Sequence, residues 1–526
     1  MSIIFKSPYP DVSIPDDAAI WNKLEQHARE HGDKPALVCK MSGRTLSFAH
    51  VFNLAQCICA GLFVSDIKKG DVVILHSFSC LKYPIVFLAL NRLGAICSPS
   101  SPQFNSDELA DQIRASKASA VISHVAFAKM ATQAAGSAGI PFNRMFTLGH
   151  IKGALGETIY RVSLAALNLP FPSLPSINSD DVVLLPFSSG TTGRPKAVEL
   201  TARSMYACGA RVAALDVDAD YILAVLPFFH IAATMIFHVT IFKQMAMIVL
   251  PRFEPGSLLR VIEDFKLDTV YVVPPIIQFL AKHPLVDKYD LSSLNRLASG
   301  AAPLEDELVD TVNNRLGLPA LQSYGMTELA GSATHSSRKE FRKGSSGELL
   351  PNTELRVRCL ETDVDLPVHQ RYFNNVEATQ EAFTDDGFIR TGDVGYIDKD
   401  GYIFIVERLK ELIKYKGHQV APAEIEDVVN SHPQVADSCC VRGIDLDTGD
   451  EIPKVFVVRQ FTGDEPLTSG ALMTFVASKV AGFKRVREVE FIDAIPKSLS
   501  GKILRHKLQL EQDKRRAAAR SIRSRL

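Results

Sequence analysis

Short apolar runs alternate with longer helical segments over the first 330 residues, and this alternation constrains the fold more than any other feature. The runs have the length of buried strands, and the segments between them have helical spacing. The strands expected from it are Val72–Leu75, Gly94–Cys97, Ala120–Ser123, Val182–Phe187, Leu223–Leu226, Met247–Leu250 and Thr269–Val273. Such alternation predicts mainly parallel sheets with helices on both faces. We therefore expect an α/β fold with two doubly wound subdomains.

The rest of the chain predicts two smaller units. Residues 344–408 carry closely spaced turn signals, which favour a small β subdomain. A compact α+β unit is expected from Lys410 onward, and 526 residues are too many for one core. We predict an N-terminal domain at residues 1–408 and a small mobile C-terminal domain at 409–526, which ends in a basic helical tail.

Composition excludes several classes of function. The net charge of −1 gives no reason to expect nucleic acid as a partner, and no apolar run has the length of a transmembrane segment. The N-terminus lacks the charged-then-apolar pattern of a signal peptide. Nine cysteines without CxxC spacing disfavour a zinc site and predict free thiols in a reducing compartment.

A loop rich in glycine and hydroxyl side chains follows the expected strand 182–187. It runs from Ser188 to Lys196 with the sequence Ser-Ser-Gly-Thr-Thr-Gly-Arg-Pro-Lys. Glycines let the backbone approach a ligand closely, and hydroxyl and N–H groups can point at phosphate oxygens. The loop is not a P-loop, because no glycine directly precedes Lys196 and Ala197 follows it. A surface loop is the alternative reading of this segment alone.

The loop resembles the nucleotide-phosphate loop of the adenylate-forming superfamily, which includes acyl-CoA synthetases, 4-coumarate–CoA ligases and firefly luciferase. Further motifs follow in the same order. They are Leu226–His230, Ser299–Pro303, Ser323–Glu328, Thr391–Gly395, Glu407–Gly417 and Pro496–Leu504. The resemblance covers nearly the whole chain, and its pattern is closest to a 4-coumarate–CoA ligase-like protein. It implies an ATP-dependent acid–CoA ligase that forms an acyl-adenylate and then an acyl-CoA, with ATP, Mg²⁺ and CoA.

The resemblance also implies a role for each matching residue at the nucleotide. Thr191, Thr192 and Lys196 would hold the outgoing phosphates, Glu328 with Thr191 would hold Mg²⁺, and Lys502 would act on the α-phosphate and carboxylate. Gly300 and Ala301 would lie against adenine, and Asp393 and Arg408 would bind ribose. The full ATP or AMP set is Ser189, Gly190, Thr191, Thr192, Gly193, Lys196, Ala301, Gln322, Ser323, Tyr324, Thr327, Asp393, Arg408, Lys410, Lys414, Gln419 and Lys502.

The same resemblance implies an acid site, CoA contacts and a hinge. His230, Ala232 and Ala301 would line the acid pocket, and His230 would also be catalytic. Arg252, Lys416 and Gly417 would contact CoA. Lys410 would be the hinge about which the C-terminal domain turns after adenylation, withdrawing Lys502 and bringing the Lys414–Gln419 loop toward the site. Ala232 stands where coumarate ligases have tyrosine, which favours a roomier apolar pocket and a fatty or bulky aryl acid.

Two features leave alternatives open. The segment between Leu355 and Asn375 is shorter than in the family, and Arg371 stands where the family has glycine, so a degenerate non-catalytic binder is one alternative. An adenylase that passes the acid to an acceptor other than CoA is another. The intact Lys196, Asp393 and Lys502 favour an enzyme over a binder.

The chain ends with Ser524-Arg525-Leu526 on a basic tail, close to the Ser-Lys-Leu peroxisomal address. This predicts a peroxisomal import receptor as a partner and a peroxisomal location, with the cytoplasm as the alternative.

Overall fold

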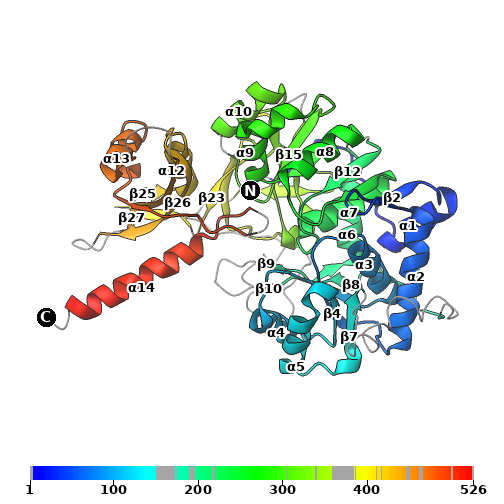
Figure 1. Ribbon diagram of the computed structural model, residues 1–526. Coiled ribbons are helices and arrows are strands. Elements are labelled where there is room, and N and C mark those ends of the chain that lie inside the picture. Colours follow the sequence, from blue (N-terminus) through cyan, green and yellow to red (C-terminus); the bar gives the residue numbers. More distant parts are fainter. Residues whose placement is uncertain are drawn as a thin grey trace.

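The computed structural model shows a large body and a smaller C-terminal unit beside it (Figure 1). It describes residues 4–149, 172–174, 176–188, 196–215, 219–304, 306–337, 341–357, 384, 387–409, 411–415, 418–445, 451–460, 466–498 and 501–523. For residues 419 and 515–523 it describes the backbone alone. The expectation of a shortened segment between Leu355 and Asn375 falls mostly on residues 358–375, which lie outside the described residues.

The first sheet has six strands in the order β11-β8-β5-β4-β6-β7. All neighbours run parallel except β11 and β8. Its strands are β4 (Val72–His76), β5 (Ile96–Ser100), β6 (Ala120–His124), β7 (Met145–Leu148), β8 (Val182–Leu184) and β11 (Leu200–Thr201). The helices between them are α3 (Lys82–Leu93), α4 (Ser106–Ser116) and α5 (Ala128–Ser137). This confirms the expected doubly wound arrangement.

Two further sheets complete the larger body. One has the order β12-β13-β2-β3, and the other is the parallel sheet β14-β15-β16. Their strands are β2 (Pro35–Cys39), β3 (Arg44–Ser47), β12 (Tyr221–Ala224), β13 (Ala246–Val249), β14 (Thr269–Val272), β15 (Arg296–Ser299) and β16 (Ala320–Gln322). The helices around them are α1 (Ile20–Glu30), α2 (Phe48–Val64), α6 (Ala202–Ala213), α7 (Ile231–Lys243), α8 (Pro255–Phe265), α9 (Pro274–Lys282) and α10 (Asp306–Leu316).

Local sequence explains where these elements begin and end. The helical spacing of Leu46–Val64 predicts a helix over those residues. The observed α2 starts at Phe48, because residues 44–47 pair with β2 and Ser47 caps the helix by accepting from His50 N–H. The strand expected to start at Gly94 starts at Ile96, since Gly94 ends α3 in the left-handed conformation.

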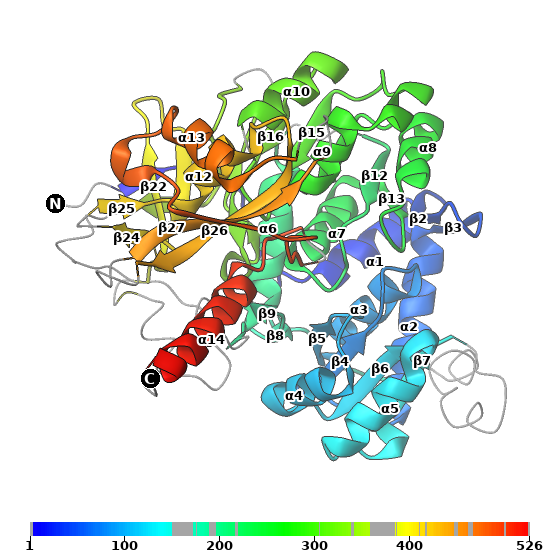
Figure 2. The same cartoon turned by 60° about the vertical axis from the view of Figure 1, so that its left-hand side comes forward.

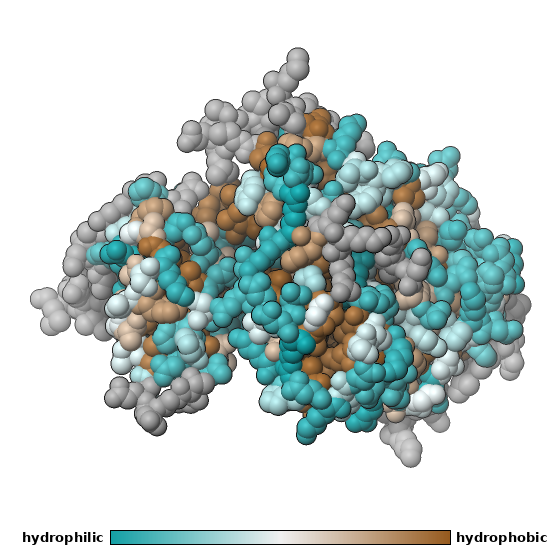
Figure 3. Space-filling model, turned by 90° about the horizontal axis from the view of Figure 1, so that it is seen from above, coloured by the Kyte–Doolittle hydropathy of each residue, from teal (hydrophilic) through white to brown (hydrophobic). Residues whose placement is uncertain are grey.

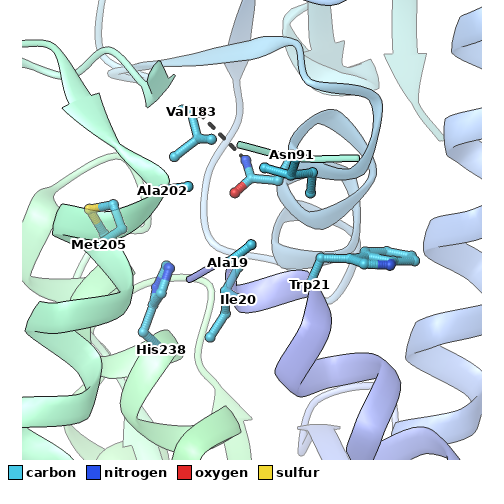
Figure 4. A pocket seen from close by; sticks show the side chains of 9 residues that line it. Ala19, Ile20, Trp21, Asn91, Val183, Ala202, Met205 and His238 are labelled. Atoms are coloured by element: carbon cyan, nitrogen blue, oxygen red, sulfur yellow. Dashed lines mark hydrogen bonds between the residues drawn. The ribbon is translucent and has the colours of Figure 1, made fainter. Parts of the chain in front are cut away.

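The interior is apolar, and α1 is fixed within it where α3, α6 and α7 come together. Figure 4 shows Trp21 and Ile20 of α1, Asn91 of α3 and His238 of α7 around a cavity of about 10 Å³. A cavity of about 10 Å³ is at the lower limit of what can hold one water molecule. The Nε2 atom of His238 is buried there without a hydrogen-bond partner among the described residues. Among these residues, no helix is both long and apolar enough to cross a membrane, and the cysteines are free thiols.

A hairpin of β22 (Asp393–Ile397) and β23 (Ile403–Arg408) leads into the C-terminal unit. That unit contains the hairpin β24 (Ile413–Tyr415) and β25 (His418–Val420), and the sheet β26 (Val435–Ile444), β27 (Glu451–Arg459) and β28 (Glu488–Phe491). Helices α12 (Pro422–Asn430) and α13 (Ser469–Ala477) pack on it, and α14 (Arg505–Arg523) extends away from it, as Figure 2 shows.

Candidate active site

A cavity of about 1080 Å³ lies where the C-terminal unit meets the larger body. Side chains from both line it, including His230 and Glu328 from the larger body and Lys502 from the C-terminal unit. On the face shown in Figure 3, hydrophilic residues cover much of the outer surface, and the larger hydrophobic areas lie between them. The cavity opens at the carboxyl end of β15, where Gly300 and Ala301 follow the strand. Ligands of parallel sheets bind at this end.

The two ends of the predicted phosphate loop are held together in a short antiparallel pair. Ser188 in β9 (Phe187–Ser188) pairs with Lys196 in β10 (Lys196–Ala197). Both residues line the cavity. The loop itself, with Ser189, Gly190, Thr191, Thr192 and Gly193, lies outside the described residues. The pairing places the two ends of this loop at the cavity wall.

Glu328 presents a carboxylate at the same wall. It lies in a single 3-10 turn, Thr327–Leu329, is only 7% exposed, and lines the cavity together with Thr327. Magnesium is usually held by one or two carboxylates together with substrate phosphates, and not by an all-protein cage. Among the described residues there is no cluster of three or more metal-binding side chains. Glu328 therefore fits a Mg²⁺ ion that reaches the site with ATP.

The predicted adenine residues divide into two groups. Gly300, Ala301, Ser323 and Tyr324 line the cavity, and Ala301 has the unusual positive φ of 70°. The side chain of Gln322 does not line the cavity and instead forms hydrogen bonds within the larger body. Its Oε1 accepts from Leu304 N–H at 2.7 Å, and its Nε2 donates to Ser346 Oγ at 3.1 Å.

Asp393 lies behind two residues of the cavity wall. Its carboxylate is 4% exposed, forms an ion pair with Arg408 at 2.6 Å, and accepts a hydrogen bond from the hydroxyl of Tyr324. Burial raises the pKa of Asp393, and the Arg408 charge opposes that shift. Burial, followed by the nearby Asp393 charge, raises the pKa of Tyr324. This arrangement presents Arg408 and Tyr324 to a ligand and fixes their orientation.

Lys502 and His230 face the same space from different domains. Burial lowers the pKa of Lys502, and the charge of Arg408 lowers it further. Burial, followed by the Lys502 charge, lowers the pKa of His230 to about 4. His230 is therefore neutral at neutral pH. Its Nδ1 accepts from Ala232 N–H at 3.3 Å and caps α7, which leaves the ring proton on Nε2. The pair offers one cation and one neutral donor to a carboxylate.

Sequence reasoning missed a buried ion network that holds the Lys502 segment in place. Arg505 donates to Glu411 and, at 2.8 Å, to both carboxylate oxygens of Glu426. Burial raises the pKa of Glu426 to about 7, against the opposing charge of Arg505. Glu407, at the end of β23, accepts from Ala423 N–H at 2.9 Å. The one available signal was the position of Arg505, three residues after Lys502.

Ala232 also lines the cavity, whereas two other predicted residues do not. Arg252 is exposed, and Lys414 lies within β24. The predicted hinge residue Lys410, the predicted CoA residues Lys416 and Gly417, and the side chain of Gln419 lie outside the described residues.

Known proteins share this architecture over nearly the whole chain. The family described as AMP-binding enzyme matches residues 24–371, and the AMP-binding enzyme C-terminal domain matches residues 424–502. The sequence is 35% identical to 4-coumarate–CoA ligase 1 of Petroselinum crispum, across 96% of each chain.

Two solved structures show the same fold. An anthranilate CoA ligase in complex with anthranoyl-AMP has a TM-score of 0.85 and 22% identity, and covers 96% of this chain and 99% of its own. The o-succinylbenzoate coenzyme A synthetase of Bacillus subtilis, in complex with ATP and magnesium, has a TM-score of 0.79 and 22% identity, with coverage of 93% and 99%.

Proposed function

This chain belongs to the AMP-binding enzyme family and to its acid–CoA ligases, and from that premise we propose a two-step reaction with ATP and CoA. The carboxylate of an organic acid attacks the α-phosphorus of ATP, pyrophosphate leaves, and the thiol of CoA then displaces AMP from the acyl-adenylate. The observation that carries the proposal is the convergence of Lys502, His230 and Glu328 on one cavity between two domains.

The charges around the cavity suit the first step. Negative charge grows on the α-phosphate in the transition state, and a fixed cation stabilises it most where water is excluded. Lys502 supplies that cation, and the lowered pKa of its ammonium reflects how far it is removed from water. The neutral His230 ring can donate from Nε2 to the acid. Mg²⁺, held beside Glu328, would neutralise the phosphates.

We further propose that the C-terminal unit turns about Lys410 after the first step. Lys502 belongs to the C-terminal unit and lines the cavity, so the described arrangement suits adenylation. The Lys414–Gln419 loop would replace it for thioester formation, and CoA would meet Arg252, Lys416 and Gly417. A hinge needs few residues that absorb a large dihedral change, and a position between two domains suits this.

For the acid, we propose a fatty or arylpropenoic-type chain. The small side chain of Ala232 leaves room beside His230, and Met235 and Ile236 supply apolar wall farther along α7. Each additional buried methylene contributes about 0.8 kcal/mol until the pocket is full. Catalytic efficiency is therefore expected to rise with chain length through the medium range and then level off.

Two signals test the proposed reaction on a panel of acids. Acid-dependent exchange of labelled pyrophosphate into ATP reports adenylation, and CoA-dependent release of AMP reports transfer. Exchange without CoA-dependent release would support an adenylase with another acceptor. Absence of both signals with every acid would favour the alternative of a non-catalytic binding protein.

We also propose a peroxisomal location, read from Ser524-Arg525-Leu526 by an import receptor. These residues lie beyond the described part of α14. Removing the three residues from a fluorescent fusion is expected to leave it in the cytosol, and an unchanged pattern would reject the signal.

A further inference from the structure

The wall of the cavity also includes apolar side chains from several elements of the larger body. Met235 and Ile236 line it from α7, Ala298 from β15, and Leu350 from the segment after β20 (Glu348–Leu349). Arg296 begins β15 and lines the same cavity. Gly300 lies four positions farther along the chain, which corresponds to roughly 13 Å at about 3.3 Å per residue. A side chain with a permanent positive charge therefore lines the same cavity at the start of β15, away from the Gly300 end of that strand.

Among the described residues, no carboxylate forms an ion pair with this guanidinium. The Nη2 atom of Arg296 donates to Nδ1 of His335 at 2.8 Å and to the carbonyl of Ser336 at 3.2 Å. The Nε atom is buried and has no hydrogen-bond partner there. The nearby Glu348 accepts a hydrogen bond from the hydroxyl of Tyr9 at 2.9 Å. A guanidinium held by neutral groups alone in an apolar site is costly, unless a ligand supplies the missing anion.

His335 places an imidazole ring at the same position. Its Nδ1 and Nε2 lie 2.8 Å and 3.3 Å from Nη2 of Arg296, so both ring nitrogens face the guanidinium. Burial, followed by the charge of Arg296, lowers the pKa of His335 to about 3, so that the ring stays neutral. The ring also lines the cavity, and Tyr9 packs edge-on against it from outside, with ring centroids 6.4 Å apart. An oxygen anion at this end would meet the arginine beside a neutral imidazole ring.

We propose that Arg296 and His335 form a specificity subsite for a second carboxylate at the distal end of the acid. The substrate class is then a medium-length dicarboxylic acid, activated at the carboxyl group beside Lys502 and held at the other by Arg296. This inference rests on the proposed acid–CoA ligase function and narrows its substrate. Arg296 acts on binding and orientation and takes no part in the bond-forming steps.

The test compares acids that differ only at the far end. Decanedioic and dodecanedioic acids are assayed against decanoic and dodecanoic acids by CoA-dependent AMP release, with wild-type protein and Arg296→Met. The wild type is expected to prefer each diacid over the monoacid of equal length. Arg296→Met is expected to lower kcat/KM for diacids about ten- to hundredfold, mainly through KM, as expected for a lost hydrogen bond to a charged group. Monoacid activity stays or rises.

Two further variants separate specificity from folding. Arg296→Lys keeps the charge and is expected to retain part of the diacid preference. Arg260→Met removes an exposed arginine of α8 that does not line the cavity, and it is expected to leave both acids unchanged. Equal losses for monoacids and diacids in Arg296→Met, or a wild type that prefers monoacids, would overturn the subsite.

Direct binding of the same acids, measured by calorimetry, distinguishes failure of the subsite from failure of the proposed function. Arg296-dependent diacid binding without any AMP release would keep the subsite and reject the ligase reaction. AMP release with equal binding of both acids by wild type and Arg296→Met would keep the ligase reaction and reject the subsite.

Discussion

Gly501 precedes Lys502 in the C-terminal unit and lies against the larger body. One methyl group added there tests whether adenylation needs this contact between the two domains. Its φ is 76°, a left-handed conformation that favours glycine. A Cβ placed there would lie 2.9 Å from Cδ and 3.0 Å from Cγ of Pro275, which belongs to α9 in the larger body. Neither the proline ring nor the turn at Gly501 can move freely. Gly501→Ala is therefore expected to push the Lys502 segment away from the cavity.

The size of the effect follows from two separate costs. A left-handed conformation costs a non-glycine residue about 1–2 kcal/mol. Overpacking against a fixed neighbour costs about 1–3 kcal/mol more, and this part applies only while the C-terminal unit is docked. The docked form is the one proposed for adenylation. Gly501→Ala is therefore expected to slow adenylation by roughly five- to 150-fold beyond the backbone cost, since each 1.4 kcal/mol is about tenfold.

The matched control is Gly401→Ala in the turn between β22 and β23. Gly401 has a φ of 92°, but a Cβ there would meet nothing within 4 Å. This variant carries the backbone cost without the contact, and it is expected to lose stability and keep adenylation. Pyrophosphate exchange measures the first step, and consumption of supplied acyl-AMP with CoA measures the second. Equal effects of both variants on exchange, or equal loss of both steps in Gly501→Ala, would refute the reasoning.

Four further predictions address the site and the fold. Lys502→Ala should lose adenylation by about two orders of magnitude and still convert supplied acyl-AMP, because its charge acts in the first step alone; equal loss in both steps contradicts this. Lys410→Pro should keep pyrophosphate exchange and lose CoA transfer, because proline fixes φ at the proposed hinge; normal transfer would place the hinge elsewhere. His76 and His238 are fully buried, and burial lowers the pKa of each to about 4. In the unfolded chain these histidines bind protons already near pH 6.5, whereas in the folded protein they do so only near pH 4. The free energy of unfolding should therefore fall by roughly 3 kcal/mol per histidine as the pH drops from about 6.5 toward 4. Urea midpoints measured against pH test this, and midpoints that do not change with pH would reject it. Ala232→Tyr should narrow the pocket and lower kcat/KM for long-chain acids, measured by AMP release, and an unchanged chain-length profile would show that Ala232 faces elsewhere.

The sequence predicted the sheets well, because each buried parallel strand is a short apolar run that needs no tertiary information to recognise. It nevertheless missed several strands, among them β2, β7, β15 and β16, and it misplaced some element ends. Ser47 and Gly94 decide where α2 begins and α3 ends, through a capping hydrogen bond and a left-handed backbone. Apolar periodicity does not report either effect.

The candidate site was predictable where a residue belongs to an ordered motif, and not where it depends on a distant partner. Lys196, Glu328 and Lys502 were found in this way, and all three line the cavity. Arg505 was missed because its partner Glu411 lies 94 residues away in sequence. Arg296 was missed because, in sequence, it looks like any charged residue at the start of a strand.

Helix α14 is a long helix that projects from the C-terminal unit. It starts at Arg505, whose ion pairs with Glu426 and Glu411 fix it to that unit, and its 19 residues span roughly 28 Å at about 1.5 Å per residue. Any rotation of the unit is therefore amplified at the outer end of the helix, where the displacement exceeds that of Lys502. A receptor bound to this end would restrain rotation of the unit and therefore slow turnover. A fluorophore attached there would change its signal with each rotation and so report the catalytic cycle.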